Sequence, residues 1–390
     1  MNYFVINDRS CPPELCEGLL TDIRHFNHKT VNCLFVTLNE LEKNTQEIFD
    51  SAKRWEKWCE QNGYGFDWKW ITNSCTAYQP GYEDKIVRIN WFEWLTYTIH
   101  TTHNHEYNTE WNPKKEVLYI PGKMDKSNRY VMFEILAKYS GIFQDAKYSM
   151  ILNNSTQSKY LEIFAGNMDF QFTGFENLQE IRELQNNLDI ELHKSQNYQT
   201  FHYTGWPYDV NLYKDTGWSI VCETSSPEYD MINIHNAWLT EKTFRPIINK
   251  HPMIFADDFA TLHYLKKLGY KTYEFLYAEY VELFDWISRG ANLVSRETQI
   301  YYKEKIGKCL REMQNKITDT KNYEKIKDIT EHNYNTLINN AENTVIPDCG
   351  VWCDLNKKWI PLQTYLEVRY PYRNSASYSE QVEILPEKFN

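Results

Sequence analysis

The segment from Trp218 to Asp258 constrains the fold of this chain more than any other stretch. It opens with an apolar run, Trp218 to Cys222, whose length and composition predict a buried strand. After a polar loop, Thr240 and Glu241 predict the N-cap and the first turn of a helix. A second apolar strand is predicted from Pro252 to Ala256. Strand, helix and strand in this order form a parallel unit, in which ligands bind beyond the carboxyl ends of the strands.

Two cationic side chains, Lys242 and Arg245, lie on the opening turns of the predicted helix. They suit an anionic ligand such as a diphosphate, which the free backbone N–H groups of a helix start also attract. The alternative is a solvated helix face, in which Glu241 supports Arg245 four residues further on. Pro246 predicts a helix that is kinked or very short, because proline removes a backbone donor.

Three short motifs in this region follow the pattern of a known enzyme family. They are Cys222-Glu223-Thr224-Ser225, Leu239-Thr240-Glu241-Lys242 and Pro252-Met253-Ile254-Phe255. This series resembles the donor-binding core of family-10 fucosyltransferase-like glycosyltransferases, which runs approximately F-E-N-S, V-T-E-K and V-P-V-V. The chain is similar in more detail to glycosyltransferases encoded by tailed phages, which read TEKTFKPI and, after a further strand, L-x-x-L-G-Y/F-K-T-F. The corresponding segments here run from Thr240 to Ile247 and from Leu265 to Tyr273.

A second strand-to-helix turn carries a candidate phosphate contact. Glu116 to Ile120 predicts a strand, and a basic turn with one glycine leads from it into a helix that runs to Gly141. Such a turn presents N–H groups and cations to phosphate. In the phage-type enzymes a histidine and an arginine open the corresponding helix. Arg129 matches the arginine, whereas Asn128 stands in place of the histidine, so only Arg129 is carried over.

The resemblance implies an α/β protein of two Rossmann-like domains facing a cleft, the GT-B arrangement. It also implies inverting, metal-independent transfer of a sugar from a nucleotide-sugar donor. The diphosphate is expected near Arg129, Lys242 and Arg245, and the ribose or sugar hydroxyls near Glu241. The predicted donor-binding residues are Arg129, Glu223, Thr240, Glu241, Lys242 and Arg245. Cations and helix N–H groups can stabilise the leaving nucleoside diphosphate, so no metal ion and no cofactor are predicted.

The first part of the chain holds the candidates for the catalytic base. Val31 to Leu38 predicts a strand, a helix is predicted over residues 44–62, and Gly65 to Thr72 predicts another strand. This alternation is typical of an open α/β sheet. A carboxylate at the end of a strand is well placed to take the proton of an acceptor hydroxyl, and Glu40 and Asp67 are the candidates. The alternative for each is an ordinary loop carboxylate.

Four regions are predicted along the chain. Residues 1–150 form an N-terminal α/β domain on the acceptor side, and residues 151–215 form a connecting region. Residues 216–345 form the nucleotide-sugar-binding domain, and residues 346–390 form a tail that packs back on the fold.

Charge and composition bear on partners and location. The net charge of −11 argues against a general nucleic-acid coat, because non-specific duplex binding depends on lysine and arginine neutralising phosphates. The sequence shows no signal peptide and no membrane span, and nine irregularly spaced cysteines predict no disulfide framework. A cytoplasmic location is expected, in the host if the chain is phage-encoded. His100, His103 and His105 lack the nearby cysteine or carboxylate that would complete a zinc pattern.

Three alternatives for the function remain open, and the first two differ in the acceptor. Resemblance to phage enzymes favours a hydroxymethylated base in double-stranded phage DNA, which would be flipped into a pocket lined by stacking aromatic side chains. Family-10-like enzymes act on glycans, so a cell-surface or protein glycan is the rival. The third alternative is a noncatalytic structural or binding protein of a phage on the same fold, against which the presence of Glu223 and Lys242 argues.

Overall fold

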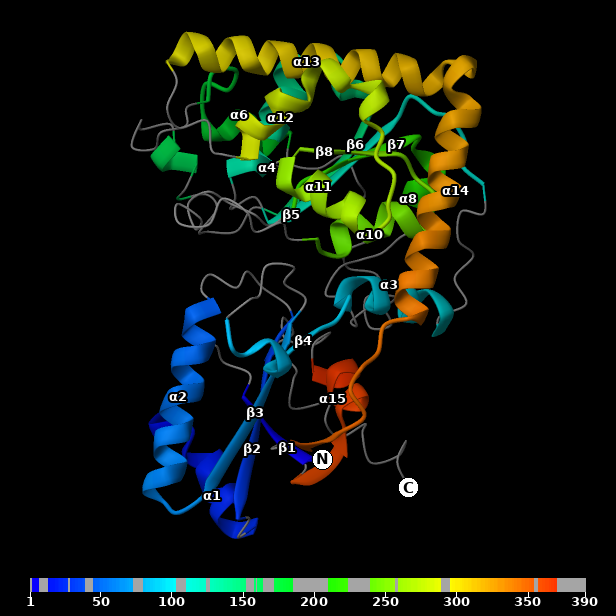
Figure 1. Ribbon diagram of the computed structural model, residues 1–390. Coiled ribbons are helices and arrows are strands. Elements are labelled where there is room, and N and C mark those ends of the chain that lie inside the picture. The colour runs from blue at the N-terminus through cyan, green and yellow to red at the C-terminus, as the bar shows by residue number, and fades with distance from the viewer. Residues whose placement is uncertain are drawn as a thin grey trace. The chain divides into compact units, whose positions relative to one another are not determined.

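The computed structural model describes residues 2–6, 13–26, 29–38, 45–72, 80–102, 110–123, 127–151, 158, 160–163, 172–184, 210–223, 239–256, 259–288, 295–353 and 357–369. These residues belong to two compact units. Unit 1 takes its described residues from Met1–Trp91 and Thr344–Asn390, and unit 2 takes its own from Phe92–Ser195 and Tyr208–Asn343. Each unit is built on its own β-sheet (Figure 1).

The sheet of unit 1 has six strands in the order β10-β9-β1-β2-β3-β4. The strands are β1 (Asn2–Ile6), β2 (Thr30–Thr37), β3 (Gly65–Thr72), β4 (Ile86–Arg88), β9 (Gly350–Cys353) and β10 (Lys358–Pro361). The helices are η1 (Pro13–Leu15), α1 (Glu17–Phe26), α2 (Thr45–Gln61), η2 (Glu83–Lys85) and α15 (Leu362–Arg369). Neighbours from β9 to β4 are parallel, whereas β10 pairs antiparallel with β9.

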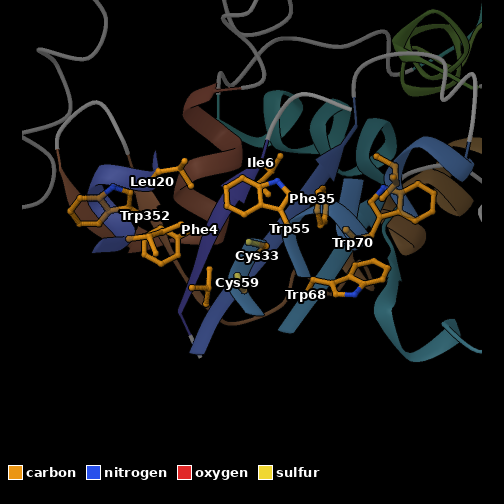
Figure 2. Packing of buried hydrophobic residues seen from close by; sticks show 14 of the residues in the cluster. Phe4, Ile6, Leu20, Cys33, Phe35, Trp55, Cys59, Trp68, Trp70 and Trp352 are labelled. Atoms are coloured by element: carbon orange, nitrogen blue, oxygen red, sulfur yellow. The ribbon is translucent and has the colours of Figure 1, made fainter. Parts of the chain in front are cut away.

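Large aromatic side chains form the core of unit 1, where α2 packs on the sheet (Figure 2). The buried face of α2 follows the three- and four-residue steps of a helix and includes Ile48, Ala52, Trp55 and Cys59. Trp70 of β3 is fully buried, and its indole Nε1 donates to Thr37 Oγ1 at 2.8 Å. The one polar atom of this large side chain therefore has a partner inside the core.

The sheet of unit 2 has four strands in the order β6-β5-β7-β8, and all neighbours are parallel. The strands are β5 (Val117–Lys123), β6 (Ala146–Ile151), β7 (Trp218–Val221) and β8 (Met253–Phe255). The helices in this part of the chain are α3 (Trp91–Thr102), α4 (Ser127–Glu134), the π-helix η3 (Ile135–Tyr139), η4 (Phe143–Asp145), α6 (Leu178–Glu183), α8 (Val210–Asp215), α10 (Glu241–Ile248), α11 (Phe259–Lys267), η7 (Glu274–Leu276), η8 (Ala278–Tyr280), α12 (Val281–Ser288), α13 (Arg296–Thr318) and α14 (Thr320–Glu342). The predicted strand–helix–strand segment is confirmed as β7, α10 and β8, and α10 is short, with Pro246 inside its eight residues.

The order of the strands creates a topological switch point between β5 and β7. β5 leads through α4 to β6 on one side, whereas β7, on the other side of β5, leads through α10 to β8. Because parallel crossovers are right-handed, the two helices cover opposite faces of the sheet. Their first turns both follow the carboxyl ends of neighbouring strands, which is where open α/β sheets bind ligands.

The units divide the chain at other positions than the sequence predicted. β5 and β6 fall within the predicted N-terminal domain, yet β5 is hydrogen-bonded to β7 and belongs to unit 2. β9 falls within the predicted tail and pairs with β1 in the sheet of unit 1. These pairings join strands far apart in the sequence, and the local pattern of each strand does not name its neighbour. The mixed α/β class with mainly parallel sheets is confirmed.

Three further expectations concern cysteines, histidines and membranes. Cys16 is disulfide-bonded, which the irregular cysteine spacing did not predict, whereas the buried Cys33 and Cys222 are free thiols. His103 and His105 lie outside the described residues. Within the described residues, no group of three or more His, Cys, Asp or Glu is placed to hold a metal ion. None of the helices in those same ranges is long and apolar enough to cross a membrane.

Candidate functional site

The pairing between β5 and β7 ends before β5 itself ends. The two strands pair from Val117 to Tyr119 on β5, the last pair being Tyr119 with Ile220. β5 continues along β6 as far as Lys123, and its register shifts between Tyr119 and Gly122. Such an irregularity bends a strand locally. We call the region beyond it the carboxyl edge: Asn128, Arg129 and Glu223, and α10 from its N-cap Thr240 to Arg245.

A buried carboxylate holds the first turn of α10. Glu223 follows β7, is 0% exposed, and accepts from Thr240 N at 2.9 Å and from Thr240 Oγ1 at 2.6 Å. The hydroxyl of Thr243 donates to the same carboxylate. Thr240 is the N-cap, as predicted, and its Oγ1 accepts from Lys242 N at 3.3 Å. Glu223 therefore orients the helix start through three donors, and Lys242 is held by the residue that Glu223 holds.

The ionisation of Glu223 is set by opposing effects. Burial raises the pKa of this carboxyl, while the charge of Lys242 and the hydrogen bonds from Thr240 and Thr243 lower it. Burial has the larger effect, so the pKa lies above its usual value. The hydrogen bonds to the carboxylate thus oppose the effect of burial on its pKa.

Glu241 and Lys242 form an ion pair at the start of α10. Lys242 Nζ lies 3.0 Å from Glu241 Oε1, and the two side chains are only 12% and 14% exposed. Burial raises the pKa of Glu241, but the positive charges of Lys242 and Arg245 outweigh it and lower the pKa to about 2. Arg245, one turn further along α10, is itself buried. The solvated helix face is therefore excluded, because these charged side chains are largely removed from water.

The first turn of α4 is joined to both central strands. Asn128 is 0% exposed, and its Nδ2 donates to the carbonyl oxygen of Glu223 at 3.2 Å. Tyr119 of β5 donates through its hydroxyl to the carbonyl oxygen of Arg129 at 2.6 Å. Arg129 is buried as well. The starts of α4 and α10 are therefore linked through Glu223, which contacts one by its backbone and the other by its carboxylate.

The far end of α4 is anchored by a second buried ion pair. Glu134 Oε2 lies 2.7 Å from Lys303 Nζ of α13, and both side chains are 0% exposed. The other carboxylate oxygen of Glu134 accepts from the backbone N–H groups of Thr173 and Gly174, each at 2.6 Å. Burial lowers the pKa of Lys303, an effect that the charge of Glu134 opposes. A helix fixed at this end presents Asn128 and Arg129 in a defined position at the other.

The carboxyl edge carries more cations than anions. Its cationic groups are Arg129, Lys242 and Arg245, and its carboxylates are Glu223 and Glu241. All five side chains are buried or nearly so, which strengthens their interaction with any charge brought beside them. Two helix starts add partial positive charge and backbone N–H groups. This combination suits a bound anion with several oxygens.

The amino edge of the same sheet holds a different polar cluster, made of Thr216, Ser219 and His251. His251 Nε2 donates to the carbonyl oxygen of Thr216 at 3.0 Å, and Ser219 Oγ donates to Nδ1 at 2.7 Å. Burial lowers the pKa of His251 to about 4, so the ring is neutral at physiological pH. Tyr213 packs edge-on against the ring, with centroids 5.4 Å apart. Both ring nitrogens are satisfied by the protein itself.

The two predicted catalytic bases have different outcomes. Glu40 lies outside the described residues, so its role stays a prediction. Asp67 is the third residue of β3 and pairs with Asn32 near the amino end of β2, away from the strand end where a base was expected. Its carboxylate forms an ion pair with Lys85 at 2.7 Å. This ion pair gives Asp67 a structural partner within unit 1.

Two residues of the carboxyl edge were not among the predicted binding residues. Thr243 donates to Glu223. Its spacing of one turn from Thr240 in the T-E-K-T sequence could have indicated that the two threonines lie on the same face of the helix. Asn128 was noted only as a departure from the phage-type pattern. Its bond to Glu223 joins segments far apart in the chain, so no local pattern indicates it.

No family model matches this chain, and neither a curated protein nor a solved structure matches it significantly. The functional assignment therefore depends on the geometry of the carboxyl edge and on the motif resemblance.

Proposed function

We propose that the carboxyl edge of unit 2 binds the diphosphate of a nucleotide-sugar and that the protein is a glycosyltransferase. The observation that carries the proposal is the bond from Asn128 Nδ2 to the Glu223 carbonyl, which brings together two helix starts bearing Arg129 and Lys242. A diphosphate has oxygens enough to accept from both helix starts and from both cations. The motif resemblance supports the same ligand independently.

The proposed chemistry is loss of the nucleoside diphosphate as an acceptor hydroxyl attacks the anomeric carbon. The bond from that carbon to the donor phosphate breaks, and the leaving oxygen gains negative charge. Arg129, Lys242 and the N–H groups of α4 and α10 stabilise this charge without reorganising, because the contacts of Glu223 and Asn128 already fix them. We assign the ribose or sugar hydroxyls to Glu241, which is paired with Lys242. Glu40 stays the candidate for the base.

We extend the proposal to the GT-B arrangement and to the acceptor. Both units carry mainly parallel sheets, which is what two Rossmann-like domains require. Unit 1 is then the acceptor side. A hydroxymethylated base in double-stranded DNA is the acceptor to test first, on the strength of the phage-type resemblance, and a glycan acceptor is the other outcome of the test.

A donor screen tests the proposal. Purified protein is incubated with a panel of nucleotide-sugars, with and without hydroxymethylated duplex DNA or cell-surface glycans, and release of nucleoside diphosphate is followed. We expect release with one donor that depends on an acceptor and is abolished by Lys242→Ala. The matched control is Lys250→Ala, because Lys250 is also a largely buried lysine of unit 2 in an ion pair, 2.9 Å from Glu331, but outside the carboxyl edge.

Three results would speak against parts of the proposal. Release that depends on glycan and not on DNA would replace the acceptor and keep the enzyme. Equal loss in Lys250→Ala and Lys242→Ala would indicate a general loss of structure. Failure of the wild-type protein to bind any donor would overturn the enzyme and leave the noncatalytic alternative.

A further inference from the structure

The side-chain amide of Asn128 has one hydrogen-bonding atom in use and one unused. Nδ2 donates to the Glu223 carbonyl, and this bond fixes which atom of the amide is the nitrogen, because a carbonyl oxygen accepts only. Oδ1 is therefore the remaining atom. It is buried and has no hydrogen-bond partner among the described residues.

A buried acceptor without a partner is costly. Leaving one unsatisfied costs about 1–3 kcal/mol relative to its solvated form, so each such atom in a native protein calls for an explanation, and a bound ligand is one. Asn128 is 0% exposed and is the second residue of α4, at the switch point and directly before Arg129. Its position at the carboxyl edge makes a bound ligand the natural partner.

The chemistry of Oδ1 restricts what that partner can be. An amide oxygen accepts hydrogen bonds and cannot donate, so it cannot contact an unprotonated phosphate oxygen favourably. It requires an O–H or N–H group. Hydroxyl groups of the ribose and of the transferred sugar both lie within a few bonds of the diphosphate, and the residue next to Asn128 is the proposed diphosphate contact Arg129.

We propose that Asn128 Oδ1 accepts a hydrogen bond from a hydroxyl group of the bound nucleotide-sugar, and that Asn128 is thereby a specificity-determining residue of the site. This inference rests on the proposed function. Arg129 and Lys242 bind the charge of the diphosphate, and Asn128 recognises the hydroxylated group attached to it. The Nδ2 bond to Glu223 keeps Oδ1 aligned before the ligand arrives.

Titration calorimetry on the full chain tests the inference with five probes. They are inorganic pyrophosphate, the tightest-binding ribonucleoside diphosphate, its 2′- and 3′-deoxy forms, and the matching nucleotide-sugar. The proteins are the wild type, Asn128→Ala and a control, Tyr277→Phe. Tyr277 is 1% exposed, and its hydroxyl likewise lacks a partner among the described residues, but it lies outside the carboxyl edge.

Asn128→Ala removes the Nδ2 bond to Glu223 as well as Oδ1, so some loss of pyrophosphate binding is expected. We expect binding of the hydroxylated ligand to weaken roughly threefold to tenfold more than binding of pyrophosphate, the value of one neutral hydrogen bond. If the hydroxyl belongs to the ribose, one deoxy form should bind the wild type more weakly than the ribonucleoside diphosphate does, by the same factor. Asn128→Ala should then bind these two ligands equally well. If it belongs to the sugar, only the nucleotide-sugar shows the additional loss. Tyr277→Phe is expected to bind all probes like the wild type.

Three results would overturn the inference. Unchanged affinity of Asn128→Ala for every probe would remove Asn128 from recognition while leaving the diphosphate site in place. An equal loss for pyrophosphate would show that Asn128 only positions α4. Absence of pyrophosphate binding by the wild type would overturn the diphosphate site and this inference together. The deoxy ligands on the wild type keep the test valid even if Asn128→Ala folds poorly.

Discussion

The two edges of the unit 2 sheet both bury polar side chains, but they use them differently. At the amino edge, His251 is neutral and both its ring nitrogens are bonded to Ser219 and Thr216. At the carboxyl edge, three cations face two carboxylates, and Asn128 retains an unused acceptor. The comparison teaches that buried polarity alone does not indicate a binding site. A binding site is indicated by buried charges and hydrogen-bonding atoms that the folded protein does not itself satisfy.

The largest expected effect comes from removing a cation of the carboxyl edge. We expect Arg129→Ala to lower the rate of sugar transfer roughly 10²–10³-fold, as for other groups that stabilise charge in a transition state. Arg129→Lys keeps the charge without the guanidinium fork and is expected to lose less. The matched control is Arg311→Ala, because Arg311 donates to the carbonyls of Tyr139 and Ser140 and has a structural role. The rates are measured by steady-state kinetics. If Arg311→Ala lowered the rate of sugar transfer as much as Arg129→Ala, Arg129 would have no special role in stabilising charge.

The next effect concerns the carboxylate that holds α10. Glu223→Ala leaves the donors of Thr240 and Thr243 without their acceptor. We expect unit 2 to lose roughly 3–5 kcal/mol of stability, because each buried donor left without an acceptor costs about 1–3 kcal/mol. Hydrogen exchange of the β7 and β8 amides reports this opening for unit 2 alone. A loss below about 1 kcal/mol would mean that Glu223 does not anchor the helix.

The amino edge predicts a pH effect instead. The pKa of folded His251 is about 4, below its usual 6.5, so between these values the unfolded chain binds more protons than the folded one. Stability of unit 2 should therefore fall as the pH falls from about 6.5 to about 4, by roughly 3 kcal/mol, and be constant above that window. The slope should be lost in His251→Gln, measured by the same hydrogen exchange. A variant that keeps the slope would show that another group causes it.

The smallest effect separates the two edges most cleanly. Ser219→Ala removes the 2.7 Å bond to His251 Nδ1 and should cost about 1–2 kcal/mol of stability. Because the amino edge is satisfied within the protein, this variant should bind pyrophosphate as the wild type does. Weaker pyrophosphate binding in Ser219→Ala would show that the amino edge also contributes to anion binding, which contradicts the distinction between the two edges.

Local patterns in the sequence were enough to predict the elements of the carboxyl edge. The apolar runs of β7 and β8 and the N-cap Thr240 are properties of a few adjacent residues, and the structure confirms them. The burial of Lys242 and Arg245 could not be predicted, because a charged first turn is equally compatible with a solvated face.

Long-range pairing was the part that the sequence did not reveal. The place of β5 beside β7, the unit boundary after Trp91 and the bond from Asn128 to Glu223 all depend on which distant segments meet. Asp67 is a different case, because the predicted strand from Gly65 to Thr72 already put it near the amino end, and only its partner Asn32 depends on the register with β2. Local patterns in a single sequence carry no signal for such contacts.

Hydrogen exchange of the wild-type protein with and without pyrophosphate tests the central claim most directly, because it locates the bound anion. We predict slower exchange of the backbone amides at residues 127–131 and 240–244, where α4 and α10 begin, and no change at residues 216–220 and 251–255 of the amino edge. Protection of the amino edge instead, or no protection at either helix start, would contradict the claim that the carboxyl edge is the anion-binding site.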